Sequence, residues 1–254
     1  MSRRLIVAVL VGCTGGALAQ EAPRPISHLG VFSLLGEGIE ITVGEYRHDS
    51  RLVPVRRETQ EVRNVGFDII AGREVRAAML RHRATATVTG FGTNTTLPAA
   101  EQRHIAGGAR EGALPGWIIQ AVQQRRLSHV LLLTRQRADV KLPTAEGSSI
   151  GRGRVDGLGF YLDPDYKLRD VSTGAVSNGA LGPHVVIELT LFDTDAAKVV
   201  RSHVIDEQFL LGSSEPKAAA DPWSYLNAEQ KIALLREALA RSLQRVLPEL
   251  LMGL

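Results

Sequence analysis

The sequence predicts an α/β protein with a mixed β-sheet and helices packed on it. Three observations favour this class. Helix-like and strand-like segments alternate in the first half of the chain, antiparallel strand patterns follow, and a long amphipathic segment closes it. The expected element order is β-β-α-β-α-β-β-β-β-α. The strands after the alternating part make the sheet mixed rather than purely parallel.

The first two expected strands are residues 28–35 and 39–46. The second strand alternates apolar Ile39, Ile41 and Val43 with polar residues, which is typical of a half-buried strand. Two glycines in the short connection favour a tight turn. We therefore expect the two strands to form a hairpin.

The next segments predict a crossover, a helix, a strand and a loop. Residues 47–65 are rich in charge and predict an irregular crossover. Residues 67–83 carry apolar side chains on one face at helical spacing, and residues 84–91 predict the strand that follows. Residues 92–113 are polar and glycine-rich, and they predict a long loop of the kind that is often functional or mobile.

The second half begins with a helix and the most apolar strand of the chain. Pro115 is placed to open a helix over 115–126, because proline at the first turn sacrifices no hydrogen bond. The continuous apolar run at 128–134 predicts a strand covered on both faces. Further strands are expected at 155–162, 185–192 and 199–205, the last two paired across a turn.

The closing helix is predicted to begin after Asn227. Asn227 and Gln230 have the spacing of a capping box. Behind them runs an apolar stripe at helical spacing, consisting of Ile232, Leu235, Leu239, Leu243, Val246 and Leu250. Pro248 is expected to end this helix, since proline interrupts the hydrogen bonds of a helix interior.

The N-terminus has the pattern of an export signal. Arg3 and Arg4 form a basic region, residues 5–12 are apolar, and Ala17 and Ala19 are small residues at the positions that precede a cleavage site. Cleavage before Gln20 is therefore expected. The alternative of a buried N-terminal strand is less consistent with this order of features.

Cys13 offers a second form of processing. The segment LVGC at 10–13 resembles a bacterial lipobox, in which the cysteine is lipidated and becomes the first mature residue. The domain plan is thus a signal peptide at 1–19, or a lipoprotein signal that ends at residue 12. A tether at 20–26 and a single α/β domain at 27–254 follow. The expected location is periplasmic or secreted, or the outer membrane if Cys13 is lipidated, and a lipid is the only membrane contact expected.

Composition and charge exclude several classes of function. The formal net charge is +3, and loss of Arg3 and Arg4 with the signal lowers it to +1. No block of five basic residues occurs, so we expect no nucleic-acid partner. One cysteine and seven dispersed histidines give no metal-ligand spacing, so we expect neither a metal nor another cofactor.

Two segments contain candidate site residues. Ser149 lies in a G-x-S-x-G pattern, GSSIG, but the pattern marks a serine nucleophile only between a strand and a helix. A flexible loop before a strand is the expected context here. Arg152 and Arg154 could engage an anion, and the alternative is that both are solvated. Tyr161 follows a phenylalanine in a strand, so the two rings point to opposite faces and one of them could meet a partner.

Trp223 is the remaining candidate binding residue. It precedes the closing helix in the segment DPWSY, where a tryptophan can pack over the helix start. An exposed ring at this place would instead indicate an interface. Local packing is the simpler interpretation.

Several segments resemble those of known exported proteins. The segment HVVIELTLFDTDAAKVVRSHVIDE, together with SHVLLLT and the closing helix, resembles the α/β domain of periplasmic accessory lipoproteins. These include the curli-secretion lipoprotein family and the TolB amino-terminal domain. The segments LGVFSLLGE, DGLGFYLD and DPWSYLNAEQK resemble an uncharacterised group of exported proteobacterial proteins. The resemblance lies in element order, and it implies no catalytic residue.

These observations predict an exported cell-envelope protein that acts as a non-enzymatic binding or accessory module. The expected partner is an envelope protein or another envelope component. Two alternatives remain open: a secreted serine hydrolase that uses Ser149, and a periplasmic small-ligand binder that uses residues 147–161.

Overall fold

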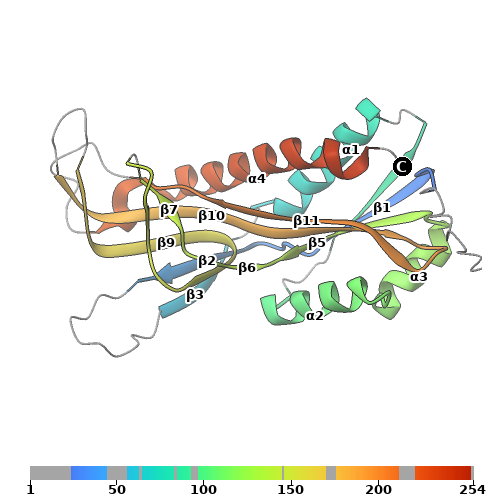
Figure 1. Cartoon of the computed structure of the whole chain (residues 1–254), viewed down its shortest axis with the longest axis horizontal. Helices are drawn as coiled ribbons and strands as arrows, with labels where there is room; N and C mark the ends of the chain where they lie inside the picture. Colours follow the sequence, from blue (N-terminus) through green and yellow to red (C-terminus); the bar gives the residue numbers. More distant parts are fainter. Residues whose placement is uncertain are drawn as a thin grey trace, which may run out of the picture.

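The described part of the protein is a mixed β-sheet with helices on both faces (Figure 1). The computed structural model describes residues 24–44, 56–62, 65–82, 85–92, 97–144, 146–169, 176–211 and 221–252. The elements are β1 (His28–Ser33), β2 (Gly38–Val43), β3 (Arg56–Glu61), α1 (Phe67–His82), β4 (Thr87–Gly92), α2 (Ala99–Arg110), α3 (Gly116–Arg125), β5 (His129–Arg135), β6 (Arg137–Asp139), β7 (Leu142–Pro143), β8 (Ser149–Ile150), β9 (Arg154–Arg169), β10 (Val176–Asp193), β11 (Lys198–Gln208), η1 (Pro222–Tyr225) and α4 (Ala228–Leu251). The α/β class and the mixed sheet are confirmed.

The two halves of the sheet pair with successive parts of the same edge of the long strand β10. Up to Val186 it pairs antiparallel with β9, and from Ile187 onward it pairs antiparallel with β5. One half continues from β9 to β2 and β3, and the other continues from β5 to β1 and β4. On its opposite edge β10 pairs with β11. The two halves separate at residues 33–38, 134–137 and 155–157. We call this region the fork.

The predicted hairpin of the first two strands is wrong. β1 pairs in parallel with β4 and β5, whereas β2 pairs with β3 and β9, so the two strands belong to different halves of the sheet. Gly36 turns the chain at the fork with a φ of 61° rather than closing a two-stranded ribbon. Burial explains the choice, because β1 is covered almost throughout and needs a strand on each side.

The largest core lies between the sheet and the helices α1 and α4. β5 contributes Leu131 and Leu133, β10 contributes Val185, Ile187, Leu189 and Leu191, and the two helices supply buried side chains such as Phe67, Val75, Leu235 and Leu243. The two helices pack on this face beside each other, as Figure 1 shows. Burial of this apolar surface is the main term that stabilises the fold.

The opposite face has two separate covers. Over β1 and β5 lie α2 and α3, which enclose a core around Phe32, Val130 and Leu132 (Figure 1). Over β9 and β10 lies the segment 137–150, which includes β6, β7 and β8. This segment packs Val140 and Leu142 on the sheet. The fork lies where these two covers meet.

The closing helix α4 begins as the sequence predicts and ends later. Asn227 accepts a hydrogen bond from Gln230 N, and the Gln230 side chain accepts one from Asn227 N, which completes the capping box. Pro248 lies inside the helix, so the prediction that it ends α4 is wrong. Proline removes one backbone donor there, and the burial of Leu250 and Leu251 holds the last turn on the sheet.

Two further predictions are wrong. Part of 92–113, predicted to be a loop, forms helix α2, whose buried face includes Gln102, Ile105 and Ala109. Part of 47–65, predicted to be irregular, forms the edge strand β3, which pairs with β2. Helix α2 is partly polar because one of its faces lies in solvent, and β3 is polar because residues 57–61 are all exposed at the edge of the sheet.

The predictions for residues 1–23, including Cys13 and the cleavage site, lie outside the described residues. Within the described ranges, none of the helices combines the length and the apolar character needed to cross a membrane.

Candidate functional site

The fork brings buried charges to the ends of two parallel strands. β1 and β5 are parallel neighbours, and their carboxyl ends, at Ser33 and Arg135, both reach the fork. In open α/β sheets, ligands bind in the crevice outside the carboxyl ends of strands, at the point where the strand order changes direction. The fork is such a point, since the chain leaves β1 for the other half of the sheet.

Arg135 closes the gap between the two halves. Its side chain is buried, and its Nε donates a hydrogen bond to Leu35 O at 2.7 Å. Its Nη2 donates to Leu35 O and Gly38 O. Burial lowers the pKa of Arg135 to about 10, although nearby Glu40 and Asp68 act in the opposite direction. The guanidinium therefore stays charged at neutral pH and joins the end of β1 to the start of β2.

Asp68, in the first turn of α1, fixes the same loop from the other side. Its carboxylate accepts hydrogen bonds from Ser33 Oγ, from Leu35 N at 3.1 Å and from Gly36 N at 3.3 Å. Burial raises the pKa of Asp68, while these three donors lower it. The fork is thus held by one cation and one anion that both bind the loop between β1 and β2.

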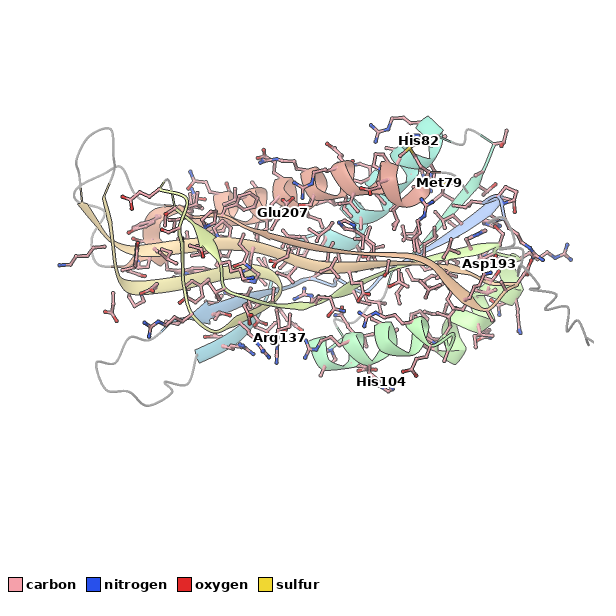
Figure 2. The ribbon with its side chains drawn as sticks, viewed as in Figure 1. Met79, His82, His104, Arg137, Asp193 and Glu207 are labelled. Carbon is pink, nitrogen blue, oxygen red and sulfur yellow. The ribbon has the colours of Figure 1, made fainter. Side chains whose placement is uncertain are left out.

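On the side of the sheet that α2 covers, three arginine side chains surround one buried carboxylate. Asp156 accepts from Arg137 Nη2 at 2.7 Å and from Arg103 Nη1 at 3.0 Å, and Arg57 Nη1 lies 3.5 Å from it. The three arginines come from β6, α2 and β3. The Asp156 side chain is 6% exposed, whereas those of Arg57, Arg103 and Arg137 are about a third exposed. Figure 2 shows Arg137 beside the end of α2. We call these three side chains the arginine cluster.

Glu40 of β2 is a second acid at the edge of the arginine cluster. Its side chain is buried, and its Oε1 lies 3.9 Å from Arg57 Nε, too far for a hydrogen bond. Burial and the neighbouring charge of Asp156 raise the pKa of Glu40 to about 6, although Arg57, Arg135 and Arg137 lower it. With this pKa, Glu40 changes its charge near pH 6.

The helix α2 is docked on the fork by polar contacts. Gln102 accepts from Arg135 N at 2.8 Å and donates to Leu97 O at 2.9 Å. About two helical turns later, Arg110 Nε donates to the buried Glu188 at 2.8 Å. These contacts place α2 so that Arg103 reaches Asp156.

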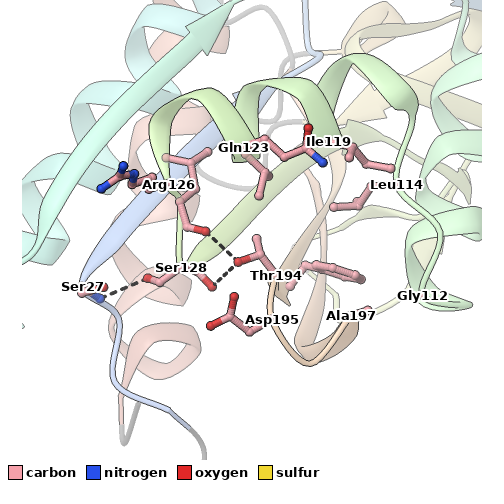
Figure 3. Close-up of a pocket in the computed structure, with 13 residues that line it drawn as sticks. Ser27, Gly112, Leu114, Ile119, Gln123, Arg126, Ser128, Thr194, Asp195 and Ala197 are labelled. Atoms are coloured by element: carbon pink, nitrogen blue, oxygen red, sulfur yellow. Dashed lines mark hydrogen bonds between the residues drawn. The ribbon is translucent and has the colours of Figure 1, made fainter.

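A pocket of about 700 Å³ lies at the opposite end of β1 and β5, beside α3 (Figure 3). Its walls come from α3, from the loop before it, from the start of β5 and from the turn between β10 and β11. The apolar lining consists of Leu114, Ile119, Val122, Leu127 and Phe192. The volume is in the range typical of binding pockets.

Several polar groups of the pocket hydrogen bond to the protein itself. Ser128 Oγ accepts from Ser27 N at 3.2 Å, and Thr194 Oγ1 donates to the carbonyl oxygens of Leu127 and Ser128 (Figure 3). Asp195 is paired with Arg24 at 2.6 Å. Gln123 and Arg126 also line the pocket, so it offers a ligand an apolar wall together with an amide and a guanidinium group.

The predicted binding residues Arg152, Arg154 and Tyr161 lie near one another, but the structure gives each a structural contact. Tyr161 is buried beneath the 137–150 segment, and its hydroxyl accepts a hydrogen bond from Arg152 N at 3.1 Å. Arg154 is paired with Asp139 at 3.1 Å, with both side chains exposed. Their role in binding stays a prediction.

Trp223 lies apart from them, in η1 before α4. Its ring packs edge-on against Phe160 at 5.5 Å, and Lys231 Nζ lies 4.0 Å from the ring centroid. Burial lowers the pKa of Lys231, with Asp221 acting against it. Trp223 also lines a second cavity of about 320 Å³ with Ile41.

Ser149 lies in the short antiparallel pair of β7 and β8, opposite Pro143. It is exposed, and the chain continues from it into β9 rather than into a helix. The G-x-S-x-G pattern thus lacks the strand–serine–helix context of an esterase nucleophile. Among the residues that the structure describes, no group of three or more metal-ligating side chains comes together.

The sequence did not reveal the arginine cluster. Arg57 and Arg103 fall in segments that were predicted to be irregular, so nothing placed them beside Asp156. One signal was available: Gln102, Ile105 and Ala109 follow helical spacing, but two glycines and the polar composition of the segment obscured it.

Comparisons with known proteins give no family. No family model matches the chain, and no curated protein matches it. A DUF330 protein from Xanthomonas campestris has 9% identity and a TM-score of 0.39, over 92% of this chain and 89% of that one. A homologue of neuraminyllactose-binding hemagglutinin from Helicobacter pylori has 12% identity and a TM-score of 0.38, over 93% and 88% of the two chains.

Both of these proteins are bacterial, but likeness at this level carries no inference about function. Neither is described as a curli-secretion or TolB protein, and the predicted resemblance to those families stays a prediction.

Proposed function

We propose that this chain is an exported, non-enzymatic binding module of the cell envelope, and that it docks a partner protein at the pocket beside α3. The observation that carries the proposal is the apolar wall of that pocket, where Ile119 is exposed and Val122 is half-buried. A partner that inserts apolar side chains removes this surface from water, which favours association.

A protein partner fits this surface better than a small molecule. Trp117, which is 43% exposed, is a second exposed apolar side chain of α3; it lies outside the pocket, on the other flank of the helix, and packs edge-on against Phe32. Exposed tryptophan is enriched at interfaces because it combines a large apolar area with few rotatable bonds. A ligand confined to the pocket would leave Trp117 in solvent.

The test is site-specific photo-crosslinking in the organism that encodes the protein. A photoreactive phenylalanine at position 119 is compared with one at Ile69, a more exposed position on α1. We expect a discrete adduct with an identifiable envelope protein from position 119 alone, and its loss in the Val122→Glu variant. The same adducts from both positions, or no adduct from position 119, would contradict the proposal.

The hydrolase alternative has its own test. Purified protein is assayed on a panel of esters, with Ser149→Ala as the matched variant. The proposal expects no turnover that depends on Ser149, and hydrolysis that the variant abolishes would overturn the non-enzymatic assignment.

A further inference from the structure

The arginine cluster carries more positive charge than its acids neutralise. Arg57, Arg103 and Arg137 surround the single carboxylate of Asp156 within 3.5 Å. Arg137 alone forms a two-pronged contact with it, through Nε at 2.9 Å and Nη2 at 2.7 Å. Three like charges held around one carboxylate repel one another, and a bound anion would relieve that repulsion.

The cluster also has donors left over. Within the described part of the chain, neither Arg103 Nη2 nor Arg137 Nη1 has a hydrogen-bond acceptor. The side chains are 28% and 36% exposed, so these groups can reach solvent while their guanidinium planes are fixed by Asp156. Fixed planar guanidinium groups suit the oxygens of a phosphate or sulfate, because each can donate two parallel hydrogen bonds.

We propose that the arginine cluster is a binding site for a tetrahedral oxyanion, a phosphate or sulfate group, held by Arg103 and Arg137 with Arg57 as the third cation. Asp156 positions the three side chains and does not itself touch the ligand. The site lies at the fork, at the opposite end of β1 and β5 from the pocket beside α3, so it is independent of partner docking there.

Glu40 makes the affinity of this site depend on pH. The groups that face Glu40 are Asp156 of β9, Arg57 of β3, Arg135 of β5 and Arg137 of β6. When Glu40 is ionised, it cancels part of the positive charge of the cluster. Because its pKa is raised to about 6, protonation below that pH removes this negative charge. Affinity for an anion therefore rises as the pH falls through about 6.

His184 does not add to this pH dependence. It is buried within β10, opposite Gly159 of β9, and burial lowers its pKa to about 4, so it stays neutral over the range in which Glu40 titrates.

Sulfate is the suitable probe, since its own charge does not change over this range. Binding to the mature chain is measured by isothermal titration calorimetry at low ionic strength. We expect one saturable site that Arg103→Gln and Arg137→Gln each weaken by about tenfold or more. Arg241→Gln, which removes an exposed arginine of α4, should leave the affinity unchanged. Equal affinity in the wild type and Arg137→Gln would overturn the proposal.

A second variant avoids the ambiguity of lost folding. Glu40→Gln removes the competing carboxylate, so at about pH 7.5 it should strengthen sulfate binding by about three- to tenfold. It should also abolish the pH dependence between about pH 5.5 and pH 7.5. A misfolded variant cannot bind more tightly, and unchanged or weaker binding would contradict the role of Glu40 and the location of the site.

Two sources could supply the anionic group, a soluble phosphomonoester or a phospholipid headgroup. Glycerol 3-phosphate and vesicles that contain phosphatidic acid are therefore each tested for displacement of sulfate. Displacement by either one supports the site and identifies the source. Displacement by neither would overturn the assignment of a phosphate ligand.

Discussion

Replacement of Arg135 by methionine tests whether one buried cation holds the two halves of the sheet together. Methionine matches the length of the aliphatic part of the side chain, which packs where Gly157 leaves room for it. The substitution removes every hydrogen bond that the guanidinium donates to Leu35 O and Gly38 O. It also removes the cation that lowers the pKa of Asp68, and one of the three cations that lower the pKa of Glu40.

The expected loss follows from these contacts. Two buried carbonyl groups left without a donor cost about 1–3 kcal/mol each. Removal of the buried charge offsets part of this loss of stability, because the guanidinium no longer has to be desolvated on folding. We therefore expect the Arg135→Met variant to be less stable by about 3–5 kcal/mol, which is a large fraction of the stability of a typical domain.

The assay is urea denaturation of both proteins, with the free energy of unfolding taken from linear extrapolation. Arg241→Met, on the exposed face of α4, is the control and should change stability by less than about 0.5 kcal/mol. If Arg135→Met loses less than about 1 kcal/mol with an unchanged urea dependence, then the fork does not rely on this side chain.

Three other predictions concern stability. His184 is buried, and its pKa is lowered to about 4, so as the pH falls the unfolded chain takes up a proton at this residue before the folded protein does. Between about pH 7 and pH 5 the free energy of unfolding of the wild type should therefore fall by about 2 kcal/mol relative to that of His184→Gln. Urea denaturation of both proteins at both pH values measures this difference. An Ala at Gly159 would place its Cβ 1.9 Å from Glu40 O in the neighbouring strand, so Gly159→Ala should lower the melting temperature, whereas Gly107→Ala, which meets open space on α2, should keep or raise it. Asn227→Ala breaks the capping box of α4 and should cost about 1 kcal/mol in the same denaturation assay; no loss would show that the cap is dispensable.

Elements with strong local patterns could be predicted from the sequence. The helices α1, α3 and α4 and the buried strand β5 lie within a few residues of their predicted positions, because helical spacing and a continuous apolar run are local signals. The edge strand β3 has no such signal, since its sequence RRETQE is polar throughout. Strand partners also escaped prediction. The pairing of β1 with β4 and β5 joins residues far apart in the chain, and nearby glycines favoured a hairpin instead.

The candidate sites were harder to predict than the elements. The arginine cluster unites side chains of β3, α2 and β6 with Asp156 of β9, and the sequence places none of them near another. The pocket beside α3 likewise combines a loop, a helix and a turn. By contrast, local composition predicted Arg152 and Tyr161 as binding residues. In the structure, Arg152 N donates a hydrogen bond to the Tyr161 hydroxyl.

The claim on which the proposed function depends is that the chain is exported, and mass spectrometry of the native N-terminus tests it most directly. The protein is isolated from fractionated cells of the encoding organism, without a tag at the N-terminus. We predict recovery from the envelope fraction, with a chain that begins at Gln20 or at a lipidated Cys13. Recovery from the cytosol, with residues 1–19 still attached, would contradict the account.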